Sequence, residues 1–187
     1  MRRVYLAGPD VFMPDPVARG AALKAVCAAH GLQGVYPLDD LAGEPAEWAG
    51  LPAWRRIALR NEAHITGCDA LIANLSPFRG PSADVGTVFE LGFMRALGRP
   101  VFGWSASPLN FTARTRRFLG VAPQATHDPE GWLIEDFGCT DNLMIDGAIA
   151  ASGGLLAVQE APQAAFARCV AACARLLSGQ SAPPPTS

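Results

Sequence analysis

The sequence has little excess charge and no long apolar run. Its 187 residues carry a formal net charge of -2, and 17% of them are charged, so neither a nucleic-acid surface nor an anionic membrane surface is indicated as a partner. No stretch approaches the roughly 20 apolar residues of a membrane-spanning helix. The apolar run behind the N-terminal arginines ends at Gly8, which is too early for the core of a signal peptide. We expect a soluble, cytoplasmic protein.

Cysteine is scarce and irregularly spaced. There are five cysteines, an odd number over a wide span, which does not match a secreted disulfide framework. Cys169 and Cys173 are four residues apart on an expected helix and could share a metal ion, but no histidine stands at ligand spacing to them. We expect reduced cysteines packed in the core and no metal site.

Three common signatures of cofactor binding and catalysis are missing. No G-x-G-x-x-G dinucleotide pattern follows the first expected strand, and no G-x-x-x-x-G-K-[ST] phosphate loop occurs. The G-x-S-x-G motif of many hydrolases is also missing, which argues against acyl hydrolysis. The sequence therefore predicts a protein without an organic cofactor.

The composition is that of a folded domain, with strand and helix patterns that alternate. Half of the residues are hydrophobic, and the length suits a single domain with its own core, here residues 1–177. The proline-rich segment 178–187 is expected to be disordered. Residues 39–52 are expected to form a loop, and residues 105–140 an irregular segment long enough to suggest function. Strands are predicted at 3–7, 35–38, 69–75, 101–104 and 155–158, and helices at 16–30, 53–66, 84–97, 141–151 and 162–177.

This alternation predicts an α/β fold with a doubly wound, five-stranded parallel sheet and helices on both faces. The expected strand order is 2-1-3-4-5, of the flavodoxin or Rossmann-like type. In such sheets a ligand binds beyond the carboxyl ends of the strands, where the order reverses. Here that place lies between the first and third strands, whose following loops are residues 8–10 and 76–84.

Two carboxylates occur in the segment DVGTVFELG, residues 84–92. Glu90 falls in the first turns of the expected helix, where unpaired backbone N–H groups and the helix dipole favour an ionised carboxylate. Such a carboxylate can attack an anomeric carbon, and Asp84, in a different setting, can handle the proton of the leaving group. The spacing alone favours the alternative of an N-cap at Asp84 and a surface position for Glu90, whereas the apolar neighbours Phe89 and Leu91 argue against a solvated Glu90.

Four segments together resemble the nucleoside 2-deoxyribosyltransferase family, in particular its trypanosomal and bacterial branch. They occur in the family's order and span residues 4 to about 148. The segments are YLAGPDVF at 5–12, CDALIANLSPFRG at 68–80, DVGTVFELG at 84–92, and DFGCTDNLM at 136–144.

The resemblance implies roles for several residues of these segments. Glu90 corresponds to the nucleophile that forms a 2-deoxyribosyl ester, and Asp84 to the residue that contacts the nucleobase and handles its proton. Tyr5 stands where the family has a tyrosine that orients the nucleophile. Gly8 and Phe12 would line the pocket near the base and the sugar. Taken alone, Tyr5 would be interpreted as a core aromatic residue.

The resemblance also implies a shared active site. Asn142 and Met144 match an Asn-x-Met element that a neighbouring subunit supplies, with the asparagine near the sugar 5'-hydroxyl, so the protein is expected to be a homo-oligomer. Taken alone, Asn142 would be a helix cap and Met144 a packing residue. Asn61 stands where some members have a base-binding aspartate and others asparagine, which leaves base preference open. His127 matches no motif and is expected to be a surface histidine.

The expected activity is exchange of the nucleobase of a 2'-deoxynucleoside donor for a free nucleobase acceptor, through a covalent intermediate on Glu90 and without a cofactor. One rival is an N-glycoside hydrolase of nucleosides or nucleoside 5'-monophosphates. Asp10 would repel a phosphate if it faced the site, whereas Arg79 could supply a cation. The other rival is a non-catalytic nucleotide-sensing domain on the same fold. The intact pair of Glu90 and Asp84 argues against a sensor.

Overall fold

The computed structural model describes residues 1–159 and 161–179. Their centre is a five-stranded sheet in which all paired strands are parallel and the order is β2-β1-β3-β4-β5. This confirms the predicted fold class and strand order. The strands are β1 (Arg2–Ala7), β2 (Leu32–Val35), β3 (Ala70–Asn74), β4 (Val101–Ser105) and β5 (Leu156–Val158).

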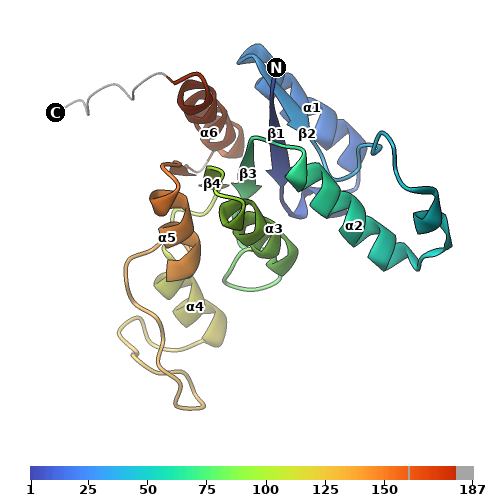
Figure 1. The fold of residues 1–187 in the computed structure, drawn as a ribbon. Helices are drawn as coiled ribbons and strands as arrows, with labels where there is room; N and C mark the ends of the chain where they lie inside the picture. The colour runs from blue at the N-terminus through green and yellow to red at the C-terminus, as the bar shows by residue number, and fades with distance from the viewer. Residues whose placement is uncertain (160, 180–187) are drawn as a thin grey trace.

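Helices cover both faces of the sheet (Figure 1). One core cluster joins the sheet to α1 and α6, and a second joins the other face to α2, α3 and α5. The α-helices are α1 (Pro16–Ala29), α2 (Ala53–Thr66), α3 (Val85–Ala96), α4 (Phe111–Leu119), α5 (Leu143–Ala151) and α6 (Pro162–Leu177), and the 3-10 helices are η1 (Pro9–Phe12) and η2 (Ala46–Gly50).

The alternation of side chains along β1 determines which residues meet α3. Val4 and Leu6 pack in the cluster with α1 and α6, whereas Tyr5 and Ala7 pack in the cluster with α3. Successive side chains of a strand point to opposite faces, so Tyr5 lies on the face that carries Glu90. All of these β1 side chains are buried.

The second strand differs from the prediction, which placed it at residues 35–38. In the structure β2 ends at Val35, and the strand includes Gly34. A Cβ at Gly34 would come within 3.3 Å of the Lys24 backbone, so glycine here allows α1 to pack closely on the strand. Glycine weakens a strand pattern in the sequence, and the apolar residues that follow, up to Leu38, belong to the next loop.

The two long irregular predictions were wrong in part. The loop at 39–52 contains η2, and the segment 105–140 contains α4. The side chain of Asn110 caps the N-terminus of α4 by accepting a hydrogen bond from the Ala113 N–H, and Gly120 ends it with φ of 67°. An asparagine before a helix and a glycine after it are start and stop signals, so both boundaries of α4 were visible in the sequence.

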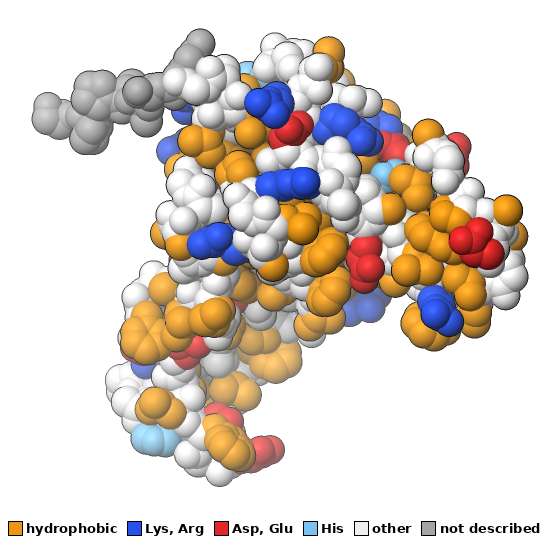
Figure 2. All heavy atoms as spheres, viewed as in Figure 1, with side chains coloured by type: hydrophobic (Ala, Val, Ile, Leu, Met, Phe, Trp, Pro, Cys, Tyr) orange, Lys and Arg blue, Asp and Glu red, His pale blue; other side chains and the backbone are white. Residues whose placement is uncertain are grey.

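The part of the chain from α4 to the start of α5 extends away from the sheet (Figure 1). Hydrophobic side chains lie at the surface of this part (Figure 2). Within the described residues, no helix is both long and apolar enough to cross a membrane. The exposed apolar residues in the part from α4 to the start of α5 include Phe118, Trp132, Leu133 and Phe137.

From position 180 onward, the predicted tail lies outside the described residues.

Candidate active site

A cavity of about 310 Å³ lies where the sequence predicted a ligand, between the segments that follow β1 and β3. Gly8 comes from the first of these segments and Asp84 from the second. Asn61 reaches the cavity from α2 and Glu90 from α3. The remaining walls are mostly apolar and include Val11, Phe12, Pro37, Leu38 and Ile57.

Glu90 is held through one of its two carboxylate oxygens. The Tyr5 hydroxyl donates a hydrogen bond of 2.7 Å to Glu90 Oε1, and the Asn61 Nδ2 donates one of 3.2 Å to the same oxygen. No hydrogen bond to Oε2 is found among the described residues. The geometry therefore orients the carboxyl group and leaves one oxygen available for chemistry in the cavity.

The pKa of Glu90 is raised from 4.5 to about 7. Burial is the main cause, and the negative charge of Asp84 adds to it, whereas the hydrogen bonds from Tyr5 and Asn61 lower the pKa. This corrects the expectation that the helix N-terminus would favour ionisation. Glu90 lies in the second turn of α3, which begins at Val85, and the helix dipole acts mainly within the first turn.

Asp84 has a structural contact as well as a position in the cavity wall. It is the N-cap of α3, where its Oδ2 accepts hydrogen bonds from the Thr87 N–H at 2.9 Å and the Thr87 hydroxyl at 3.0 Å. The alternative interpretation of Asp84 as an N-cap is thus confirmed. Its Oδ1 accepts no hydrogen bond from the described residues, so capping and proton handling are compatible.

Asn61 offers an unused acceptor. Its Nδ2 is engaged with Glu90, and its Oδ1 is buried without a hydrogen-bond partner among the described residues. A buried polar atom without a partner is costly, and this one belongs to a residue that lines the cavity. A ligand with an N–H or O–H group would satisfy it.

The segment after β1 lines the cavity with Gly8, Val11 and Phe12. A Cβ at Gly8 would lie 2.8 Å from both the Asn74 Cβ and the Asp10 Oδ2, so only glycine fits there. Phe12 is 60% exposed and stacks on Phe78, with 5.5 Å between the ring centroids. Phe12 gives the cavity an aromatic wall, and Phe78 packs against Phe12 from outside the cavity lining.

Asp10 is buried and paired, and it is not among the described residues that line the cavity beside Glu90. Its Oδ1 accepts a hydrogen bond of 2.7 Å from Arg19 Nε, and its Oδ2 one of 2.8 Å from Asn74 Nδ2. With 5% of its surface exposed, Asp10 is a structural link between β3, α1 and the segment after β1. Asp10 was expected to repel a phosphate only if it faced the site, and the described lining of this cavity does not include it.

Asn142 and Met144 do not line the cavity of their own chain among its described residues. Asn142 caps α5, accepting from the Met144 N–H at 3.0 Å and donating to Glu135 Oε2 at 2.7 Å. Met144 is 71% exposed and lines an apolar groove of about 760 Å³ between α3 and α5. The structure thus brings the other six candidate residues together and places these two elsewhere.

Sequence reasoning missed several residues of the wall. Ile57 stands one helical turn before Asn61 on α2, a spacing that places the two on one face and could have identified it. Val11, Pro37 and Leu38 had no such signal. His127 is exposed, as expected, and contacts the Thr126 hydroxyl.

The cysteines mostly pack in the core. Four of the five are buried, and Cys139 is partly exposed. Burial raises the pKa of the Cys169 and Cys173 thiols to about 12, so they are protonated at neutral pH. In residues 1–159 and 161–179, no three His, Cys, Asp or Glu side chains form a group that could hold a metal ion.

Comparison with known proteins identifies the family. The family described as "Nucleoside 2-deoxyribosyltransferase" matches residues 4–144. The chain belongs to this family. The match extends from just before Tyr5 to Met144 and so includes every candidate residue. The family's members are enzymes of glycosyl transfer on nucleosides.

Among individual similar proteins, one solved structure has a name that agrees with this assignment. A 2-deoxyribosyltransferase structure from Leishmania mexicana is 31% identical, covers 91% of this chain and 97% of its own, and superimposes with a TM-score of 0.65. An uncharacterized protein of Schizosaccharomyces pombe is 32% identical, covering 95% of this chain and 90% of its own. A conserved protein of Enterococcus faecalis V583 is 20% identical with a TM-score of 0.56, over 91% of this chain and 97% of its own, and shares the fold.

Proposed function

We propose that this family member is a nucleoside 2-deoxyribosyltransferase that moves a 2-deoxyribosyl group between nucleobases through an ester on Glu90. The observation that carries the proposal is how the Glu90 carboxyl group is hydrogen-bonded and oriented. Its Oε1 is held by Tyr5 and Asn61, its Oε2 has no hydrogen-bond partner within the described part of the chain, and the cavity around it has mostly apolar walls. A carboxylate held in such a cavity suits attack on an anomeric carbon.

In the first half of the proposed reaction, Glu90 in its ionised form attacks C1' of the donor. The C1'–O bond to Glu90 forms as the C1'–N bond to the base breaks, and the electron pair of that bond goes to the base nitrogen. Asp84 assists protonation of the departing base. The missing 2'-hydroxyl removes an electron-withdrawing group and so eases an oxocarbenium-like transition state.

In the second half, a nitrogen of the acceptor base attacks C1' from the opposite face and the ester bond breaks. Glu90 leaves as a carboxylate, and Asp84 takes the proton that the acceptor loses. Two inversions give net retention. Neither half requires a metal or an organic cofactor. Asn61 Oδ1, which has no partner in residues 1–159 and 161–179, would accept a hydrogen bond from an N–H group of the base, with Gly8 and Phe12 beside base and sugar.

The proposed active site includes residues from a second copy of the chain. Asn142 and Met144 would approach the sugar of the neighbouring cavity, which accounts for their position outside the cavity of their own chain. The exposed Met144 and the apolar groove between α3 and α5 suit burial in a homo-oligomer, because contiguous exposed apolar surfaces often mark interaction sites.

Chromatography of reaction mixtures tests this function. The protein is incubated with 2'-deoxyinosine or thymidine, with and without free adenine. We expect new 2'-deoxyadenosine only when adenine is present, and comparison of the two donors reports the preference between purine and pyrimidine. Release of free base that does not depend on adenine, with no exchange product, would assign the protein to the hydrolases. Failure to consume either nucleoside or its 5'-monophosphate would favour a nucleotide sensor.

Hydrolysis of 5'-monophosphates is the second candidate, and Arg79 is the observation that favours it. The Arg79 guanidinium lies 5.3 Å from the Phe12 ring centroid and 4.7 Å from that of Phe78. It forms no salt bridge with the described residues. A cation at the aromatic wall of the cavity could meet a phosphate. Arg79→Ala should then weaken use of the monophosphate and spare use of the nucleoside.

A further inference from the structure

The carboxylate of Asp141 connects two segments that matter for the proposed reaction. Its Oδ1 accepts hydrogen bonds from the Ser82 hydroxyl at 2.5 Å and the Asn142 N–H at 2.8 Å. Its Oδ2 accepts from the Ala83 N–H at 3.0 Å and from Arg114 Nη2 at 3.0 Å. We call Asp141 and these four partners the Asp141 cluster.

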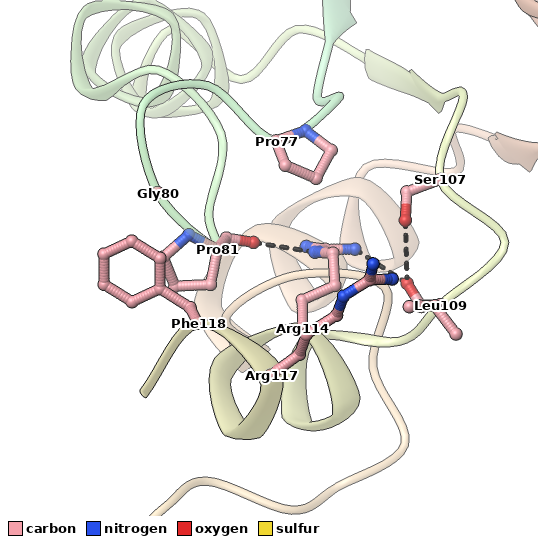
Figure 3. A pocket seen from close by; sticks show the side chains of 8 residues that line it. All are labelled: Pro77, Gly80, Pro81, Ser107, Leu109, Arg114, Arg117 and Phe118. Carbon is pink, nitrogen blue, oxygen red and sulfur yellow. Dashed lines mark hydrogen bonds between the residues drawn. The ribbon is translucent and has the colours of Figure 1, made fainter. Parts of the chain in front are cut away.

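Arg114 ties the cluster to α4. Its Nε donates to the Pro81 carbonyl oxygen at 2.7 Å, and its Nη1 to the Leu109 carbonyl oxygen at 2.8 Å. Figure 3 shows the Arg114 side chain reaching from α4 between these two carbonyl groups, at a pocket of about 330 Å³. The Arg114 side chain is 6% exposed and that of Asp141 is 0% exposed. All three donor nitrogens of the guanidinium are therefore engaged in a solvent-poor setting.

Two partners of Asp141 are directly next to, or identical with, residues of the proposed active site. Ala83 directly precedes Asp84, the proposed proton-handling residue, and Asn142 directly follows Asp141. A buried carboxylate with this many hydrogen bonds has one arrangement that satisfies all its partners. Any shift of Asp141 therefore moves the start of α3 and the start of α5 together.

We infer that Asp141 is a positioning residue for two active sites at once: it holds Asp84 in the cavity of its own chain and presents Asn142 to the cavity of a neighbouring copy. The inference rests on the proposed function, in which Asn142 serves a second subunit. Asp141 itself contacts neither substrate nor Glu90. Its effect is on the placement of groups that do, and a misplacement of about 1 Å can lower a rate by about 100-fold.

The test uses mixed oligomers of two inactive chains. A Glu90→Ala chain and an Asn142→Ala chain carry different affinity tags, are co-expressed, and are isolated through both tags. If Asn142 serves the neighbour, the chain that keeps Glu90 receives an intact Asn142 from its partner, and exchange activity returns. This reference pair establishes that the site is shared.

An Asp141→Asn chain is then paired with each of these chains. We expect activity to return in neither pairing. With the Glu90→Ala chain, the only Glu90 lies beside a displaced Asp84. With the Asn142→Ala chain, the only well-formed cavity receives a displaced Asn142. Alone, Asp141→Asn should lower kcat and raise KM, with a combined loss in kcat/KM of about 10- to 100-fold.

Glu135→Ala is the matched control. Glu135 accepts hydrogen bonds from Asn142 Nδ2 and the Leu143 N–H, both at 2.7 Å, and none from residues 82–84 among the described residues. Its loss should affect only the Asn142 segment. We therefore expect the Glu135→Ala chain to regain activity with the Glu90→Ala chain but not with the Asn142→Ala chain.

Folding is checked by the melting temperature of each isolated oligomer. A purely structural weakening leaves kcat and KM unchanged well below that temperature, whereas a positioning role changes both. If Asp141→Asn does not fold, Arg114→Lys replaces it, because lysine keeps a cation opposite Asp141 and loses the forked contacts. The same pattern of pairings is expected for it.

Return of activity when Asp141→Asn is paired with either chain would show that only one segment depends on Asp141, and would overturn the inference. A failure of the reference pair has a different meaning. It would show that the active site is not shared between subunits. The inferred double role of Asp141 would then also be wrong, because that role requires a shared site. Base exchange by the unmodified chain, and its dependence on Glu90, would still stand.

Discussion

The Tyr5 hydroxyl donates a hydrogen bond of 2.7 Å to Glu90 Oε1, although 85 positions separate the two residues in the chain. Tyr5 is fully buried on β1, so its ring is fixed by the core and not by the cavity. Because Tyr5 is part of the sheet, folding of the sheet fixes the hydrogen bond that orients the Glu90 carboxyl group and lowers its pKa.

Tyr5→Phe should make the enzyme less active at neutral pH. The hydrogen bond from Tyr5 lowers the pKa of Glu90, so its removal raises that pKa further and shifts the rise of kcat/KM to higher pH. We expect a loss of roughly tenfold or more at neutral pH, since hydrogen bonds to charged groups contribute about 1.5–3 kcal/mol. Tyr36→Phe is the control, because the buried Tyr36 hydroxyl has no partner among the described residues. An identical pH profile for Tyr5→Phe and wild type would contradict this prediction.

Glu90→Gln should remove a pH-dependent loss of stability. The pKa of Glu90 is raised from 4.5 to about 7 in the folded protein, so folding favours the protonated form. The stability that this provides is fully present below the unfolded pKa and is lost as the pH rises through the folded pKa. The melting temperature of wild type relative to Glu90→Gln should therefore fall between about pH 4.5 and 7. Parallel curves for the two proteins would mean that Glu90 ionises as easily in the folded chain as in the unfolded one.

Asp84→Asn and Asp84→Ala should separate the two roles of Asp84. Asparagine is as good an N-cap as aspartate, so Asp84→Asn should unfold near the wild-type temperature while its exchange rate falls by about 10²- to 10⁴-fold, the range for loss of a proton-transfer group. Asp84→Ala should lose the same activity and, in addition, about 1 kcal/mol of stability. Equal activity of Asp84→Asn and wild type would reduce Asp84 to a cap.

Asp10→Asn should destabilise the fold. The change leaves the Arg19 guanidinium, 19% exposed, without its charge partner, and disturbs the contact with Asn74. We expect a loss of about 1–3 kcal/mol in the free energy of unfolding, measured by urea denaturation. Arg2→Ala is the control, because the Arg2 side chain is 61% exposed in its pair with Asp69 and such pairs contribute less than about 1 kcal/mol. Equal effects of the two changes would contradict the structural role of Asp10.

The sequence predicted the sheet order and the location of the cavity because both depend on patterns along the chain. Buried parallel strands are continuous apolar runs, such as residues 69–75, and the ligand position follows from the strand order. The position of β2 was predicted wrongly because of Gly34. This glycine allows α1 to pack closely on the strand, but in the sequence a glycine indicates a break in a strand. The caps of α4 at Asn110 and Gly120 were present but lay in a segment too polar to show an apolar period.

Contacts between distant residues could not be predicted in the same way. The raised pKa of Glu90 depends on how deeply α3 packs, and the engagement of Asn61 with Glu90 depends on the angle between α2 and α3. The Asp141 cluster joins residues from three segments, of which one was expected to be irregular. No pattern in the sequence connects Arg114 with Asp141, because Arg114 lies in none of the four family segments and a contact across 27 residues leaves no periodic signal.

Intact-protein mass spectrometry after rapid acid quenching tests the central claim most directly. The protein is mixed with a 2'-deoxynucleoside donor in the absence of an acceptor base, quenched, and digested to locate any adduct. We predict a mass increase of one 2-deoxyribosyl group on the peptide that contains Glu90, and no adduct in Glu90→Ala, which should be folded and slower by several orders of magnitude in exchange. Near-normal turnover by Glu90→Ala, or an adduct on another residue, would contradict a mechanism through Glu90.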